Sequence, residues 1–195
     1  ELLMLFTIHD LIQLFPNIRG DIVKSTTIQS VSTDSRKEMS DALFIPIIGE
    51  SFDGHDYLDE AISHGAIAAL WDKETEIPVS LPDGFPLFLV DDTITALQQL
   101  SQYYRRKVNP LVIGITGSNG KTTTKDLVGH VLKTTFKTHV TKGNFNNHIG
   151  LPLTILSMPH DTEMLVLEMG MNHPGEITLL ANIAEPDVAI ITNIG

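Results

Sequence analysis

The chain has 195 residues, of which 42% are hydrophobic and none is cysteine, and its formal net charge at pH 7 is -11. This length can bury one large core or two modest ones, and the lack of cysteine excludes disulfides, thiolate metal sites and a cysteine nucleophile. The negative charge repels phosphate backbones and anionic lipid at long range, so we expect neither nucleic acid nor a membrane as a partner.

The apolar opening of the chain is not expected to be a targeting signal. The apolar opening at residues 2–6 has no basic region before it and runs into His9 and Asp10, unlike a signal peptide. No apolar run approaches the ~20 residues that a spanning helix needs. We therefore expect a cytoplasmic protein, which the absence of cysteine also suits. The chain begins at Glu1 and stops at Gly195 after a strand-like segment, which predicts a fragment of a longer protein.

Residues 1–90 change their hydrophobic period often, which predicts a first domain of short mixed elements. Thr7 can cap a short helix at residues 8–15. Strands are predicted at residues 28–33, 42–48, 66–71 and 87–90. A second helix at residues 57–64 is expected to end at Gly65, because glycine tolerates positive φ. The turn-rich segment 74–86 is expected to be a loop.

From Asp91 the apolar residues recur at helical spacing, which predicts a linker helix at residues 91–108 and a second domain over residues 91–195. Asp91 or Asp92 would cap this helix. Its basic end has two interpretations: a phosphate-binding patch, or cations that stabilise the helix dipole, and we favour the second. The residues concerned are Arg105, Arg106 and Lys107.

After Pro110, strand-like segments alternate with helical ones, and many of the former are runs of Val, Ile and Leu. Strands are predicted at residues 111–116, 138–141, 164–169 and 187–192. Such runs are typical of strands covered on both faces, and the helices between them imply parallel crossovers. The predicted fold class is therefore α/β: a small mixed domain followed by an open, mainly parallel sheet. Ligands bind such sheets at the carboxyl ends of the strands, after Thr116, Met169 and Thr192.

The clearest motif is TGSNGKTTT at residues 116–124, between a strand and an amphipathic helix. Glycines let backbone N–H groups approach phosphate, and the helix start attracts the anion. Lys121 would reach the β and γ phosphates, and the hydroxyl of Thr122 would bind Mg²⁺. The general P-loop has a glycine where this chain has Ile115. The shorter G-x-x-G-K-T pattern is less typical of small GTPases and nucleoside kinases.

A carboxylate is expected beside this loop, because Glu168 ends the strand-like run at residues 164–169. It would bind Mg²⁺, or else accept backbone N–H bonds at the start of the next helix; together with Lys121 and Thr122 the metal role is favoured. The segment GNFNNHIGLPLT crowds Asn144, Asn146 and Asn147 into one loop. Amides suit recognition of a sugar, peptide or carboxylate, although they also favour turns.

His148 and His173 have no partner at metal-ligand spacing, and we interpret both as ordinary loop histidines.

Together, these segments resemble the Mur ligase family. The motifs TGSNGKTTT, GNFNNHIGLPLT, LVLEMG with the following GEI, and the terminal ITNIG occur in the order and spacing of that family. In the first domain, STDSR, LFIPIIGESFDGHDY and GAIAALW resemble its UDP-binding module. The resemblance covers nearly the whole chain, and this many motifs in sequence are hard to obtain by chance.

The resemblance implies an ATP-dependent carbon–nitrogen ligase of peptidoglycan precursor synthesis, acting as a monomer with ATP and Mg²⁺. It would add D-alanyl-D-alanine to UDP-N-acetylmuramoyl-tripeptide through an acyl phosphate. Family members continue well beyond the position of Gly195, so we expect this chain to bind substrate without completing ligation. The alternatives are another Mur ligase step, the related ligase that adds glutamate to folate but lacks a UDP-type domain, and a silent nucleotide-binding module.

By resemblance, the site residues fall into three groups. The catalytic residues would be Lys121 and Glu168, with Thr122 and Glu168 on magnesium. The ATP phosphates would contact Gly117, Ser118, Asn119, Gly120, Lys121, Thr122 and Thr123. The uridine-diphosphate sugar would contact Ser35, Arg36, Phe52, Asp53, Gly54 and His55, and the muramoyl-peptide end Asn146 and Asn147.

Overall fold

The computed structural model describes residues 5–195, so most of the apolar opening at residues 2–6 lies outside the described residues. The chain forms two compact units, Glu1–Leu97 and Gln98–Gly195. The division falls inside helix α3, Thr93–Val108. Within residues 5–195, no helix combines the length and the apolar character needed to cross a lipid bilayer.

The first unit is built on a five-stranded sheet in the order β2-β7-β6-β5-β4. Strands β4 to β7 are parallel to one another, and β2 at one edge is antiparallel to β7. The bounds are Ile18–Arg19 for β2, Ser30–Ser32 for β4, Ala42–Phe44 for β5, Ala66–Asp72 for β6 and Leu87–Val90 for β7. A separate antiparallel pair joins β1, Phe6–Thr7, to β3, Thr27–Ile28.

The short helices of this unit follow local signals in the sequence. Helix α1, Ile8–Leu14, begins with a capping box: the Thr7 hydroxyl accepts from the N–H of Asp10, and the Asp10 carboxylate accepts from the N–H of Thr7. The predicted helix at 57–64 appears as the 3-10 turn η1, Gly54–Tyr57, followed by α2, Leu58–Ser63. Gly65 then takes a φ of +114°, which confirms the expected glycine stop.

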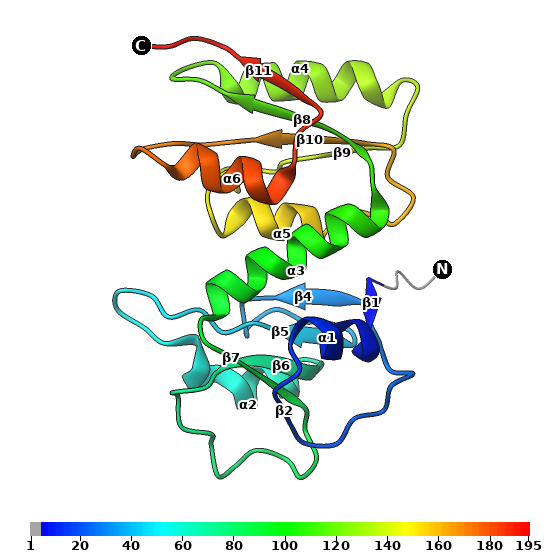
Figure 1. Cartoon of the computed structure of the whole chain (residues 1–195), viewed down its shortest axis with the longest axis vertical. Helices are drawn as coiled ribbons and strands as arrows, with labels where there is room; N and C mark the ends of the chain where they lie inside the picture. Colours follow the sequence, from blue (N-terminus) through cyan, green and yellow to red (C-terminus); the bar gives the residue numbers. More distant parts are fainter. Residues whose placement is uncertain (1–4) are drawn as a thin grey trace. The chain divides into compact units, whose positions relative to one another are not determined.

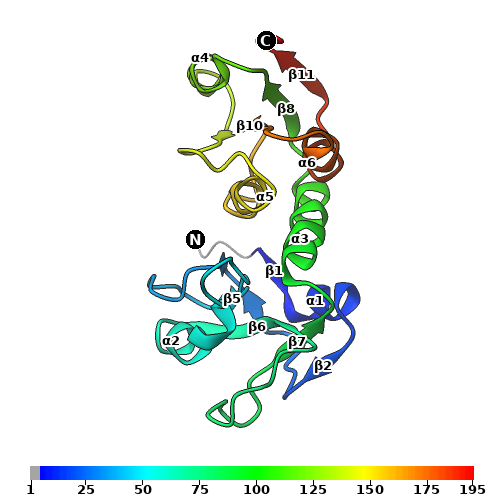
Figure 2. The ribbon, with the colours of Figure 1, turned by 90° about the vertical axis from the view of Figure 1, so that its left-hand side faces the viewer.

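Two predicted strands are shorter or divided in the structure. The segment 28–33 splits at Gln29, because β3 pairs with β1 whereas β4 pairs with β5. Strand β5 ends at Phe44 rather than continuing to residue 48, since Pro46 has no N–H with which to extend the ladder. Helix α2 packs its apolar side onto the sheet, and Figure 2 shows α1 on the opposite side of the strands.

The second unit is an open parallel sheet in the order β11-β8-β10-β9. Its strands are β8, Leu111–Thr116; β9, Thr138–Val140; β10, Met164–Glu168; and β11, Val188–Ile191. The connecting helices are α4, Lys121–Lys133; α5, Gly150–Leu156; and α6, Glu176–Ala184. Figure 1 shows α4 on one face of this sheet and α5 and α6 on the other. The prediction of a parallel α/β sheet is confirmed.

Helix α3 is anchored at both ends by charged side chains. Asp92 accepts from the N–H of Thr95, 2.7 Å away, as expected for a cap. At the basic end, Arg105 is only 5% exposed and donates to the carbonyls of Ala184 and Glu185, both at 2.9 Å. Arg106 binds the carboxylate of Glu185. Both guanidinium groups therefore secure the end of α6, and the phosphate-patch interpretation finds no support.

Candidate functional site

The glycine loop joins β8 to α4 through two residues that need positive φ. Gly117 has a φ of +140°, and a Cβ placed there would lie 2.0 Å from the hydroxyl oxygen of Thr192. Gly120 has a φ of +81° and precedes the first residue of α4 without any side-chain cap. Because α4 is uncapped, its first backbone N–H groups are left for an anion.

Two other amides of the loop are already used inside the protein. The N–H of Ser118 donates to the carbonyl of Asn193 at 3.2 Å, and the N–H of Asn119 donates to its side-chain oxygen at 2.9 Å. The hydroxyl of Thr192 donates to the carbonyl of Asn119 at 2.5 Å. The loop after β11 thus shapes the glycine loop, a role that only the terminal ITNIG motif hinted at in the sequence.

The side chains that open α4 have different environments. The ammonium of Lys121 is half-buried and donates to the carbonyl of Gly117 at 2.7 Å, so it folds back over its own loop. The hydroxyl of Thr122 lies 3.2 and 3.1 Å from the two carboxylate oxygens of Glu168. Thr123 is exposed. The structure therefore brings Lys121, Thr122 and Glu168 to one edge of the sheet.

Glu168 is 3% exposed at the end of β10 and pairs in register with Ile115 of β8. Its carboxylate accepts from Thr122 and from the amide of Asn146, at 3.1 Å, and its own N–H donates to the hydroxyl of Thr141 at 3.0 Å. The alternative role, in which Glu168 caps the next helix, does not occur: Glu176 accepts from the N–H groups there.

This oxygen-rich pair fits a magnesium ion. Mg²⁺ prefers oxygen ligands and uses one or two protein groups, with water and substrate phosphates completing its shell. The Thr122 hydroxyl and the Glu168 carboxylate are such a pair. Within residues 5–195, no cluster of three or more His, Cys, Asp or Glu side chains could hold a metal by itself. Any Mg²⁺ here would therefore depend on phosphate and water.

Asn146 and Asn147, the two asparagines predicted to bind substrate, have different hydrogen-bond partners. Asn146 reaches Glu168, whereas the side-chain oxygen of Asn147 accepts from the N–H groups of Ile149 and Gly150 and starts α5. Both line a cavity of about 320 Å³ that also includes Lys121. Its other lining residues are His148, Gly170, Met171, Asn172, Glu176, Leu179 and Leu180. His148 thus borders this cavity, which spacing in the sequence did not indicate.

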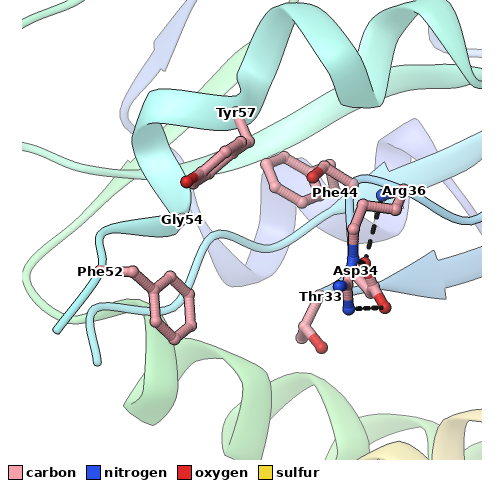
Figure 3. Close-up of a pocket in the computed structure, with 8 residues that line it drawn as sticks. Thr33, Asp34, Arg36, Phe44, Phe52, Gly54 and Tyr57 are labelled. Atoms are coloured by element: carbon pink, nitrogen blue, oxygen red, sulfur yellow. Dashed lines mark hydrogen bonds and ion pairs between the residues drawn. The ribbon is translucent and has the colours of Figure 1, made fainter. Parts of the chain in front are cut away.

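A second cavity, of about 440 Å³, lies in the first unit (Figure 3). It is lined by Thr33, Asp34, Ser35, Arg36, Phe44, Phe52, Gly54 and Tyr57. Figure 3 shows Phe52 and Tyr57 on one side and the Asp34–Arg36 pair on the other. Phe52 is 56% exposed and Tyr57 46% exposed, so large aromatic surfaces face the opening. The structure brings Ser35, Arg36, Phe52 and Gly54 together around this cavity.

The polar side of this cavity is held by two internal contacts. Arg36 binds Asp34 through two nitrogens, at 2.8 and 3.0 Å. These hydrogen bonds lower the pKa of Asp34 to about 2, so the pair is ionised at neutral pH. Ser35 is buried and donates its hydroxyl to the carboxylate of Glu60 at 2.5 Å. Ser35 therefore shapes the wall of the cavity with its hydroxyl already engaged.

Asp53 and His55 do not belong to the lining. The side chain of Asp53 accepts from the N–H and from the Nδ1 of His55, at 2.9 and 2.6 Å. His55 is 2% exposed, its Nε2 accepts from the N–H of Asp72 at 3.2 Å, and its ring packs edge-on against Trp71. Both ring nitrogens are thus engaged inside the fold. The two residues hold the η1 turn in place.

Comparison with known proteins relates both units to one family. A model described as the Mur ligase family, catalytic domain, matches residues 27–105, and one described as the Mur ligase middle domain matches residues 115–195. The UDP-N-acetylmuramoyl-tripeptide–D-alanyl-D-alanine ligase of Bacillus subtilis (strain 168) is 54% identical over 172 residues. That alignment covers 88% of this chain and 37% of the relative, so the chain spans little more than a third of that ligase.

Solved structures show the same likeness. The UDP-N-acetylmuramoylalanyl-D-glutamyl-2,6-diaminopimelate–D-alanyl-D-alanyl ligase from Acinetobacter baumannii superposes with a TM-score of 0.84 at 35% identity, over 97% of this chain and 42% of that one. The MurF ligase from Thermotoga maritima in complex with ADP superposes with a TM-score of 0.74 at 37% identity. That superposition covers 85% of this chain and 38% of the other. Sequence and fold agree in both units, and the chain belongs to the Mur ligase family.

Proposed function

We propose that this chain is the sugar-nucleotide-binding and phosphate-binding part of an ATP-dependent ligase that joins D-alanyl-D-alanine to UDP-N-acetylmuramoyl-tripeptide. The proposal is supported by the names of the relatives that match both units and by the solved relative that contains ADP. We further propose that it acts in the cytoplasm as a monomer.

One observation carries the proposal: the hydroxyl of Thr122 lies against the carboxylate of Glu168 directly beside the glycine loop. A hydroxyl from the loop and a carboxylate from the neighbouring strand are the two protein groups that a P-loop enzyme uses to bind the metal of a nucleotide. A loop that merely turned the chain would not need a carboxylate that is 3% exposed at this edge.

Magnesium bound by Thr122 and Glu168 would supply positive charge to the phosphate oxygens of ATP. The terminal carboxylate of the muramoyl peptide attacks the γ-phosphorus, the bond to the β-phosphate oxygen breaks, and ADP leaves. The amine of D-alanyl-D-alanine then attacks the acyl carbon; an amide forms, inorganic phosphate departs and the amine loses its proton. Lys121 would leave the carbonyl of Gly117 to stabilise the moving phosphoryl group, a task of electrostatics and positioning.

The first-unit cavity would bind the uridine-diphosphate end of the sugar nucleotide. Phe52 and Tyr57 present apolar ring faces suited to a base, and Arg36 places a guanidinium group near the same opening. Because Asp34 already holds Arg36 through two bonds, the guanidinium is oriented before any ligand arrives. Asn146 would contact the muramoyl-peptide end from beside Glu168.

Calorimetric titration of the 195-residue chain with Mg-ADP and with UDP-N-acetylmuramoyl-tripeptide tests the proposal. Lys121→Met and Thr122→Val should each weaken ADP binding by ~10-fold or more, since a hydrogen bond to a charged group contributes about 1.5–3 kcal/mol. Arg36→Met should weaken the binding of the sugar nucleotide and leave the binding of ADP unchanged. Lys24→Met, an exposed lysine of the first unit, is the matched control and should change neither.

Three outcomes would contradict the proposal or part of it. No saturable ADP binding, or ADP binding that ignores Lys121→Met, would remove the nucleotide site. ADP binding without sugar-nucleotide binding would favour a silent nucleotide-binding module. ADP release coupled to peptide product would contradict our expectation that these 195 residues bind substrate without completing ligation.

A further inference from the structure

We propose that a cavity between α4 and β9 is a second oxyanion-binding site, which meets the glycine loop only at Thr122 and is selective for a small phosphate- or carboxylate-bearing ligand. This α4–β9 cavity measures about 470 Å³. It is lined by Thr122, Lys125, Asp126, Lys133, Thr138, His139, Val140, Thr141, Lys142 and Gly143. It shares no lining residue with the cavity that contains Lys121 and Asn146.

The strongest reason is a buried cation. Lys125 lies one turn after Lys121 on α4 and is only 4% exposed, at a position where a core-facing helix normally places an apolar residue. Within residues 5–195 its ammonium has one partner, the carboxylate of Asp126 at 3.2 Å, and that side chain is 56% exposed. An ammonium has three N–H donors. The side chain is buried along its length, while the ammonium keeps N–H donors that the protein does not fill, so an oxyanion can complete its shell.

Two exposed lysines add to the positive charge of the same cavity. Lys133 comes from the end of α4 and Lys142 from the segment after β9, and neither has an ion-pair partner in the described part of the chain. Both lysines also act on His139. Burial lowers the pKa of His139 most, and the positive charges of Lys142 and Lys133 lower it further. Three lysines thus face one aspartate, in a chain whose net charge is -11.

The remaining lining suits an oxyanion rather than a larger polyanion. Threonines 122, 138 and 141 border the cavity and give it a polar wall. Thr141 also accepts from the N–H of Glu168, so the cavity adjoins the strand end that carries the candidate metal ligand. The rest of the molecule is acidic and would repel nucleic acid at long range, whereas a concave group of cations can still bind a small anion. Phosphate and carboxylate share this chemistry.

The test is a two-dimensional amide NMR titration with pyrophosphate in one arm and glutarate in the other, performed on Lys121→Met so that the glycine loop contributes little. Saturable shifts are expected at residues 138–143. Lys125→Met should weaken binding by ~10-fold or more, as should the double variant Lys133→Gln/Lys142→Gln. The double variant Lys24→Gln/Lys73→Gln removes the same charge from the first unit and should change affinity less than ~2-fold.

A second measurement separates a ligand site from a structural ion pair. If Lys125 is retained for a ligand, Lys125→Met should unfold at the same temperature or higher, because an apolar chain of similar size replaces a buried charge. If Lys125 serves only Asp126, Lys125→Met and Asp126→Asn should both lower the melting temperature and leave anion binding unchanged, which would overturn the proposal. So would the absence of saturable shifts in both arms, or equal loss in the control variant.

A preference between the two arms identifies the source of the ligand. Tighter binding of pyrophosphate assigns the site to a phosphate group, and tighter binding of glutarate assigns it to a carboxylate. Both arms measure anion binding and neither needs ligase activity. The experiment therefore tests this site independently of the proposed function.

Discussion

Replacing Gly170 by alanine should break the link between the asparagine loop and Glu168. A Cβ at position 170 would lie 2.8 Å from Cγ, 2.9 Å from Oδ1 and 3.0 Å from Nδ2 of Asn146. Contacts this short force the amide to move, and the amide is the group that donates to Glu168 at 3.1 Å. The φ of Gly170 is not in the positive region, so alanine adds no backbone strain.

The expected cost follows from the bond that is lost. A hydrogen bond to a charged group contributes about 1.5–3 kcal/mol, and Asn146 is only partly buried, so we expect Gly170→Ala to lower the stability of the second unit by about 1–2 kcal/mol. Asn146→Ala should cost a similar amount. Adding Gly170→Ala to Asn146→Ala should then cost almost nothing, because the amide that the new methyl group would meet has gone.

The two units allow an internal control in the same experiment. The only tryptophan, Trp71, belongs to the first unit, so its fluorescence during urea unfolding should be unchanged in all three variants. Hydrogen exchange of β10 reports the second unit. A double-mutant cycle with a coupling energy of about 1–2 kcal/mol supports the reasoning. Additive costs, or a stable Gly170→Ala variant with unchanged β10 exchange, would refute it.

Three further changes have definite expectations. Gly117→Ala should abolish tight ADP binding in calorimetry, because positive φ and the hydroxyl of Thr192 both exclude a side chain; unchanged affinity would contradict this. Arg105→Met should destabilise the second unit by about 2–4 kcal/mol in urea, since a buried and a partly buried carbonyl at the end of α6 lose their donor. Burial lowers the pKa of His139, so the unfolded state binds its proton first; stability should fall as pH drops below ~6.5, and His139→Gln should flatten that slope in thermal melts taken at several pH values.

Much of the fold could be predicted from local patterns. Segments rich in Val, Ile and Leu predicted the parallel strands β8, β10 and β11 of the second unit, and a capping threonine predicted α1. The glycine–lysine loop was recognisable because its chemistry lies within a few consecutive residues. The position of Glu168 beside this loop could also be predicted, because parallel strands end at one edge of the sheet. The register places Glu168 opposite Ile115, two residues before Gly117.

Other features depended on contacts that no local pattern specifies. The split at Gln29 follows from two different partner strands, and the burial of His55 follows from its bonds to Asp53 and Asp72. The use of loop amides by Asn193 joins residues more than seventy positions apart. Residue types indicated which groups can bind phosphate or metal. Only the packed chain decided which of them are already satisfied internally, because a donor's partner is chosen by distance in space.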